Sequence, residues 1–84
     1  MRPLHHYLSA REVGERIRAL RKMYCLTQSE LALKVGVSKN AVSSWENGEY
    51  APCVPNICML STIFDVHPLY FVVHDSVREE ENKE

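Results

Sequence analysis

Two short helical patterns joined by a three-residue turn constrain the fold of this chain more than any other feature. Thr27 and Glu30 have the spacing of a capping box, which marks a helix N-terminus, and Gly36 stands where a left-handed residue would end that helix. Ser38 can cap a second short helix, which ends before Gly48. Because isolated helices of about eight residues are marginal in water, the two must pack against each other across the turn.

The helix predicted over 39–47 has one apolar face and one polar face. Its apolar residues follow each other at helical spacing and are expected to share a core with the preceding helix: Ala41, Val42 and Trp45. The opposite face consists of hydrogen-bonding side chains without an acid, namely Lys39, Asn40, Ser43, Ser44 and Asn47. Glu46 lies off this stripe.

A pair of helices with this turn and this polar face is typical of proteins that read DNA. A turn of three or four residues, often with a glycine, sets the helices at a steep angle and leaves the second one free to enter a major groove. In that groove asparagine can form two hydrogen bonds to adenine, and lysine can donate to guanine. The alternative is an ordinary solvent-facing helix, which usually carries both signs of charge.

Three further helices are predicted around this pair, which makes the fold all-α. A capping-box spacing at Ser9 precedes a helix over 10–24, Pro55 opens a fourth helix, and Pro68 starts a short fifth helix over 69–75. The inward positions of the first and fourth helices are Val13, Ile17, Leu20, Tyr24, Ile57, Leu60, Ile63 and Phe64.

The five helices form one expected domain over 10–75, between an N-terminal arm over 1–9 and a charged tail over 76–84. The arm could enter a minor groove, as in other DNA-binding domains, or could be a packing extension or a frayed end. The longest apolar run, 69–73, is far too short to cross a bilayer, and no signal-peptide pattern opens the chain. A cytoplasmic protein without a membrane partner is therefore expected.

The net charge of −1 hides an uneven distribution. Residues 1–48 carry eight basic and four acidic side chains, whereas residues 49–84 carry two basic and seven acidic ones. The N-terminal part can therefore attract phosphate while the C-terminal part repels it. Charge alone would fit solvated helix faces equally well. The distribution therefore indicates DNA binding only in combination with the pattern of the two short helices.

Nothing in the sequence points to a catalytic or metal site. The cysteines Cys25, Cys53 and Cys58 lack CxxC spacing and are expected to be reduced thiols, with Cys58 in the core. The adjacent His5 and His6 do not have the spacing of a metal site. No nucleophile elbow, phosphate loop or paired-carboxylate pattern occurs, so neither an enzyme nor a cofactor is expected.

Residues 26–48 closely resemble the Xre family, the helix-turn-helix proteins of the phage-repressor and Cro type. The signature positions present in register are Gln28, Leu31-Ala32, Gly36-Val37-Ser38, Val42-Ser43, Trp45-Glu46 and Gly48. The resemblance spans about residues 11–74. It implies a five-helix lambda-repressor-like domain that binds double-stranded DNA with sequence specificity. Cys25 departs from the family, which usually has glycine or asparagine there.

The resemblance also implies roles for single residues. Lys39, Asn40 and Ser44 match the base-reading positions, and Ser43 and Ser38 flank them. Ser43 is expected to read bases as well, and Ser38 is expected to contact the DNA backbone. Two further backbone contacts are implied at Gln28, which resembles a phosphate-binding glutamine, and at Asn47, which could instead be a helix cap. Arg21 and Glu46 match a structural ion pair.

We expect a homodimeric transcription regulator, a repressor of the phage or mobile-element type. The dimer contact is predicted at Leu69, Tyr70, Phe71 and Val72, because this run is too apolar to be wholly exposed on a monomer. Two alternatives stay open. One is an antitoxin that binds operator DNA and a toxin, with the acidic tail over 76–84 meeting a basic protein partner. The other is a protein-interaction module that has kept the fold but no longer binds DNA, and the net negative charge favours this alternative.

Overall fold

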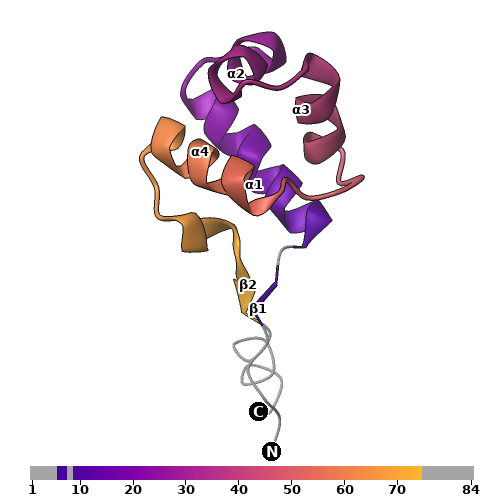
Figure 1. Cartoon of the computed structure of the whole chain (residues 1–84), viewed down its shortest axis with the longest axis vertical. Coiled ribbons are helices and arrows are strands. Elements are labelled where there is room, and N and C mark those ends of the chain that lie inside the picture. The colour runs from indigo at the N-terminus through magenta and orange to yellow at the C-terminus, as the bar shows by residue number, and fades with distance from the viewer. Residues whose placement is uncertain (1–5, 8, 75–84) are drawn as a thin grey trace, which may run out of the picture.

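The computed structural model describes the backbone of residues 6–7 and 9–74 and the side chains of residues 9–72. The predicted arm and charged tail therefore lie almost entirely outside the described residues. Four α-helices form the body of the molecule, and a short β-ribbon joins the two ends of the described chain at its base (Figure 1). The elements are β1 (His6–Tyr7), α1 (Ala10–Met23), α2 (Gln28–Val35), α3 (Lys39–Glu46), α4 (Val54–Phe64), the 3-10 helix η1 (Pro68–Phe71) and β2 (Val73–His74).

The helices begin where the capping residues predict. The Thr27 hydroxyl accepts from the Glu30 backbone N–H at 3.0 Å, and the Glu30 carboxylate accepts from the Thr27 N–H at 2.8 Å, which completes the capping box of α2. Ser38 caps α3 by accepting from Ala41 N–H at 3.1 Å. Gly36 ends α2 with φ of 91°, a left-handed conformation that glycine adopts without a side-chain clash.

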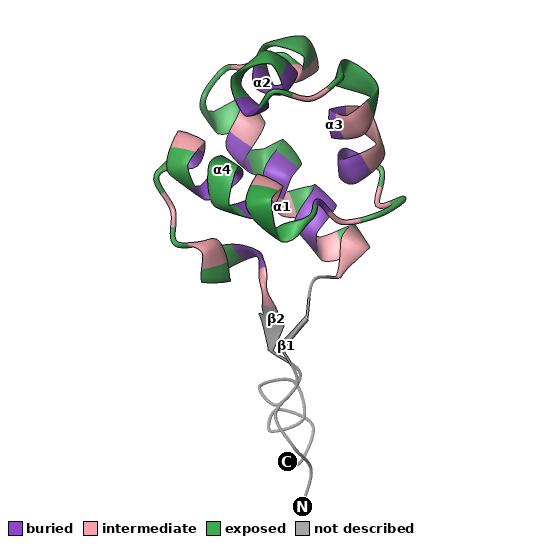
Figure 2. Ribbon diagram, in the orientation of Figure 1, coloured by how far each residue is buried: buried purple, intermediate pink, exposed green. Residues whose placement is uncertain are grey.

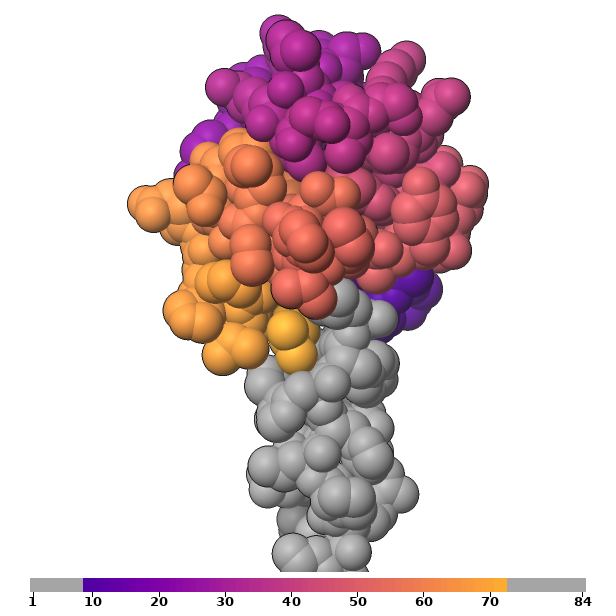
Figure 3. All heavy atoms as spheres, in the orientation of Figure 1, coloured from indigo at the N-terminus to yellow at the C-terminus, as the bar shows by residue number. Residues whose placement is uncertain are grey.

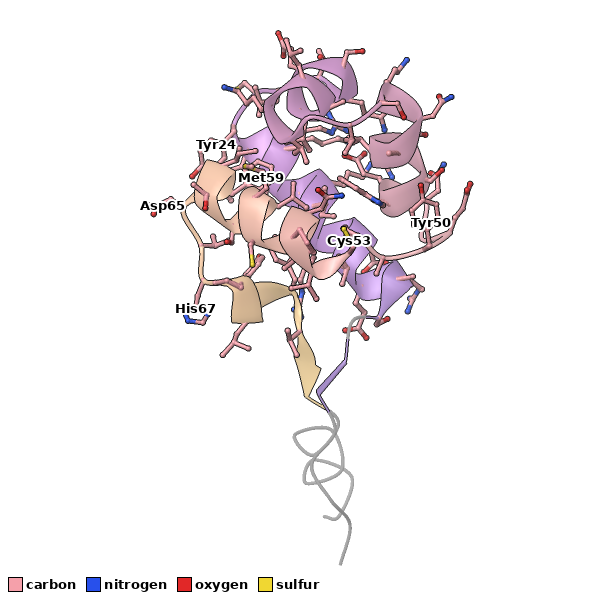
Figure 4. The ribbon with its side chains drawn as sticks, in the orientation of Figure 1. Tyr24, Tyr50, Cys53, Met59, Asp65 and His67 are labelled. Carbon is pink, nitrogen blue, oxygen red and sulfur yellow. The ribbon has the colours of Figure 1, made fainter. Side chains whose placement is uncertain are left out.

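One core lies between the four helices. Figure 2 shows the buried stretches on their inward sides. The core comprises Val13, Ile17, Leu20, Leu31, Ala32, Val35, Val42, Trp45, Ile57, Leu60, Phe64 and Phe71. Tyr24 was expected among these but is 44% exposed, because α1 ends at Met23. Its ring packs edge-on against Phe64 at a centroid distance of 5.3 Å, and its hydroxyl donates to the Phe64 carbonyl at 2.7 Å. Figure 4 shows Tyr24 beside the end of α4.

The expected fifth helix over 69–75 is wrong in extent and type. The chain makes one 3-10 turn, Pro68–Phe71, and then extends into β2, which pairs with β1 in antiparallel register, His6 with His74 and Tyr7 with Val73. The β-branched Val72 and Val73 favour this extended backbone. The all-α class is confirmed, with four α-helices and a 3-10 helix among the described residues.

Two further side chains, besides Tyr24, lie where the sequence analysis did not place them. Phe71 is fully buried, so it fills the core and is not available as the predicted dimer contact. Cys58 is exposed, because the inward stripe of α4 runs through Ile57 and Phe64 and turns the next position, 58, outward. All three cysteines are free and exposed.

Arg16 of α1 contacts the 3-10 helix η1, in addition to the burial of Phe71 in the core. The Arg16 guanidinium donates to the Tyr70 carbonyl and lies 5.5 Å from the centroid of the Tyr70 ring.

Within the described part of the chain, no helix has the length and apolar character needed to span a membrane. The same residues contain no group of three or more His, Cys, Asp or Glu that could hold a metal ion.

Candidate nucleic-acid interface

The turn between α2 and α3 fixes the angle at which α3 leaves the core. The backbone N–H groups of Gly36 and Val37 both donate to the Ala32 carbonyl, at 2.8 and 3.0 Å. This pair of bonds closes the end of α2 and sends the chain directly into the Ser38 cap of α3. Ala32 is 3% exposed and forms part of the core that α2 and α3 share.

The apolar side of α3 is anchored in the core. Val42 is fully buried and Trp45 is 2% exposed. Gly14 allows α1 to approach this end of α3 very closely, because a Cβ at Gly14 would stand 2.1 Å from the Trp45 carbonyl oxygen. Since one side of α3 is held so firmly, its other side must face outward.

The outward side of α3 carries the polar residues expected from the sequence. Lys39, Asn40 and Asn47 are exposed, and Ser43 and Ser44 are half-buried. The acid of α3, Glu46, is 6% exposed and belongs to the inward side. The structure therefore brings the five polar side chains onto one acid-free surface.

Glu46 is the centre of a buried polar cluster that joins α1, α2 and α3. Arg21 donates through Nε and Nη2 to the two carboxylate oxygens of Glu46 at 2.6 and 3.0 Å, and its Nη1 donates to the Leu26 carbonyl at 2.8 Å. The Gln28 side-chain amide donates to Glu46 Oε1 at 3.0 Å. The Arg18 guanidinium stands further away, at 3.9 Å. The cluster fixes the N-terminus of α2 relative to α3.

The electrostatics of this cluster favour its charged form. Burial disfavours the ionised Glu46 carboxylate, but the hydrogen bonds from Arg21 and Gln28 and the positive charges of Arg21 and Arg18 outweigh that effect, so the pKa of Glu46 lies below its usual value. The hydrogen bond to Glu46 raises the pKa of Arg21. The ion pair is thus a fixed structural element near neutral pH.

The three residues expected to contact a DNA backbone lie at the start of α2 and at the two ends of α3. Gln28 is the first residue of α2 and is half-buried; one of its two amide hydrogens is engaged by Glu46. Ser38 is exposed at the N-terminus of α3, and Asn47 is exposed at its C-terminus. The bond between Gln28 and Glu46 was not foreseen, because no local pattern connects residues on two different helices.

Residues 17–71 match the family model described as helix-turn-helix. The chain is a helix-turn-helix protein of the Xre/Cro type. Its fold agrees closely with the solved P22 c2 repressor in complex with a synthetic operator. That comparison has a TM-score of 0.67 and 42% identity and covers 70% of this chain and 89% of the repressor chain.

Three curated proteins, a repressor, a transcriptional regulator and an antitoxin, are similar to this chain over part of their length. Repressor protein C2 of Salmonella phage P22 is 41% identical over 63 residues, 75% of this chain. The transcriptional regulator DicA of Escherichia coli K12 is 34% identical over 67 residues, 80% of this chain. Antitoxin PezA of Streptococcus pneumoniae is 35% identical over 65 residues, 77% of this chain. The matches cover only 29%, 50% and 41% of these relatives' own lengths.

Proposed function

We propose that this helix-turn-helix protein binds a specific double-stranded DNA sequence and regulates transcription. The observation that carries the proposal is the acid-free polar surface of α3, held outward by the burial of Trp45 and Glu46 on its other side. The repressor C2 of phage P22, a relative of similar fold, is a protein that binds an operator. Repression, as for that relative, is the mode of regulation we propose.

In this proposal α3 lies in the major groove and four of its side chains face base edges. Asn40 and Lys39 are exposed near the N-terminus of α3 and can reach adenine and guanine respectively. Ser43 and Ser44 lie one turn further along and can donate or accept a hydrogen bond. Their small size lets the helix approach the groove closely.

The DNA backbone would be held at both ends of this surface. At one end, Gln28 keeps one amide hydrogen for a phosphate and stands at the N-terminus of α2, where the helix dipole favours an anion. The Ser38 hydroxyl accepts from Ala41 through its oxygen and can still donate its hydrogen. Asn47 would contact the backbone at the other end. Contacts of this kind set register and orientation without reading sequence.

We further propose that two copies bind together, with their α3 helices in successive major grooves about 34 Å apart. Helix α4 has no charged residue, and its side chains Val54 and Met59 are 66% and 44% exposed. Leu69 and Tyr70 of η1 are 55% and 44% exposed, and Val72 is half-buried. In Figure 3 the orange surfaces of α4 and η1 are continuous. Neither α4 nor η1 carries a charged side chain, so a second copy can meet them without repulsion between like charges; Asp65, which follows α4, is an exposed acid between them.

The decisive experiment selects bound duplexes from random DNA with the purified chain and with Asn40→Ala and Ser44→Ala. Each variant should lose its preference at one or two base pairs of each half-site. Affinity for the wild-type site should fall about tenfold to a hundredfold in Asn40→Ala, which loses a bidentate contact, and at most about tenfold in Ser44→Ala, which loses one hydrogen bond. Leu33→Ala, at an exposed position of α2 outside both proposed surfaces, is the matched control and should select the wild-type site. Failure of the wild-type chain to bind any duplex in dilute buffer would contradict the proposal.

An antitoxin is the second candidate, because the chain is 35% identical to Antitoxin PezA over 65 residues. An antitoxin of this fold would bind a toxin as well as an operator. A toxin gene beside the gene for this chain, and rescue of growth when both are expressed together, would distinguish this function from simple repression.

A further inference from the structure

A polar groove runs between α1 and the C-terminal end of α3, next to the proposed DNA surface. It has a volume of about 350 Å³ and is lined by Arg11, Glu15, Arg18, Glu46, Asn47 and Gly48. Figure 1 shows the N-terminal end of α1 below the C-terminal end of α3. The two segments meet closely, since a Cβ at Gly48 would lie 3.3 Å from the Arg11 Cα.

Arg18 is a cation of this groove whose guanidinium is paired with an acid only loosely. Its Nε stands 3.9 Å from Glu46 Oε1, which is beyond hydrogen-bond distance. That oxygen already accepts from Arg21 and Gln28, each at 3.0 Å. The Arg18 side chain is 54% exposed, whereas the Glu46 side chain is 1% exposed. The guanidinium is therefore held near the groove by charge while its donors remain available to a ligand.

Arg11 provides a second, weakly occupied cation at the same groove. Its Nε lies 3.8 Å from the Glu15 carboxylate, one helical turn away, and the two side chains are 80% and 63% exposed. An exposed pair of this kind contributes little free energy and is readily exchanged for a better partner. The groove thus offers two arginines, partly offset by Glu15, beside the exposed amide of Asn47.

We propose that this groove binds a phosphate of the DNA backbone, with Arg18 as the main donor, Arg11 as the second, and the Asn47 amide at its edge. The inference rests on the proposed DNA binding and extends its footprint from α3 onto α1. A duplex that lies along α3 must pass its backbone beyond Asn47, which is where the groove opens. Arginine suits this role because its planar guanidinium can donate two hydrogen bonds to one phosphate.

The test measures affinity for the selected operator and for a scrambled duplex of equal length, between about 50 and 200 mM salt. Arg18→Gln should weaken binding to both duplexes by a similar factor and reduce the log-log salt slope by about 0.9, the value for one neutralised phosphate. Arg18→Lys keeps the charge and should retain the slope. Glu15→Gln removes the opposing charge from the same groove and should tighten binding to both duplexes.

Lys34→Gln is the matched control, because Lys34 lines a different cleft with Tyr24, Leu26 and Ile63. It should keep the wild-type salt slope. An unchanged salt slope in Arg18→Gln, with the unfolding midpoint also unchanged, would overturn the proposal that the groove binds a phosphate. The proposal that α3 reads bases would still stand. A shifted base preference in Arg18→Gln would likewise overturn it, since a phosphate contact carries no sequence information. Loss of all DNA binding by the wild-type chain would refute both proposals.

Discussion

Glu46 shows how a single buried acid can organise the surface of α3 that is proposed to bind DNA. Its side chain is 1% exposed and receives hydrogen bonds from Arg21 and Gln28 on two other helices. If this carboxylate pointed outward, it would repel phosphate at the C-terminal end of α3. Buried and paired, it instead fixes Gln28 at the N-terminus of α2 and leaves the outward face without an acid.

Glu46→Gln should destabilise the protein most strongly near neutral pH. The variant removes one charge of a buried ion pair and leaves Arg21 without its counter-ion, which costs about 3 kcal/mol of unfolding free energy. Because the pKa of Glu46 is lowered in the folded state, its contribution is complete above the unfolded pKa of about 4.3 and is lost as pH falls through the folded value. The difference between wild type and variant should therefore shrink in acid.

Urea unfolding at neutral pH and below pH of about 4 would measure this difference. Glu15→Gln is a suitable control, because Glu15 is exposed and its pair with Arg11 is loose. Its unfolding free energy should stay within about 0.5 kcal/mol of wild type. A destabilisation by Glu46→Gln that is the same at both pH values would show that the lost contribution does not depend on the charge of Glu46.

Residue-level features were predictable from sequence where their cause is local. The caps at Thr27 and Ser38 depend on neighbours within three positions, so their hydrogen bonds could be anticipated. The bond from Gln28 to Glu46 joins positions 18 residues apart and depends on how the helices cross. The positive φ of 58° at Cys25 could be anticipated only from the family resemblance, because the family usually has glycine or asparagine at this position and both adopt a positive φ readily.

At the scale of elements, the crossing of α1 and α3 decides where the polar surface points. Gly14 permits the contact, and its role depends on space more than on helix propensity. Alanine there would be expected to favour the helix by about 1 kcal/mol on propensity alone. The Trp45 carbonyl oxygen, 2.1 Å from the position of the new Cβ, makes that gain unattainable without moving α3.

Gly14→Ala should therefore destabilise the domain by about 1–3 kcal/mol, the usual cost of overpacking a well-packed contact. Thermal unfolding would show it as a lower midpoint. Glu15→Ala, at the adjacent exposed position of α1, provides a control without steric conflict and should differ little from wild type. A Gly14→Ala variant at least as stable as wild type would contradict the close approach of α1 to α3.

The sequence predicted the order of the helices and the stripes that face the core, because helical periodicity and caps are encoded over short stretches. It failed at the fifth element, where the apolar run over 69–73 has no periodicity to indicate a helix. Pairing of β2 with β1 at the other end of the chain decided that conformation. The same lack of periodicity hid the fact that Phe71 faces the core while its neighbours Leu69 and Tyr70 face outward.

At the scale of the whole molecule, the body offers two surfaces of different chemistry. One includes α3 and the groove beside α1, where the exposed side chains are basic or polar, with Glu15 as the exposed acid of the groove. The other includes α4 and η1, where exposed apolar side chains occur and α4 carries no charge. A protein that binds two successive major grooves needs both kinds of surface, one for DNA and one for its second copy.

Leu69→Glu should convert the proposed dimer into a monomer without disturbing the core. Leu69 is 55% exposed, so the substitution leaves Phe71 in place, and across a twofold contact it brings two like charges together. Sedimentation should show a dissociation constant raised at least about tenfold, and binding to a two-half-site operator should lose cooperativity while weak half-site binding remains. Leu33→Glu on α2, at a side chain that is 84% exposed, should leave the dimer intact. If Leu69→Glu sediments as wild type does, the self-contact must involve another surface.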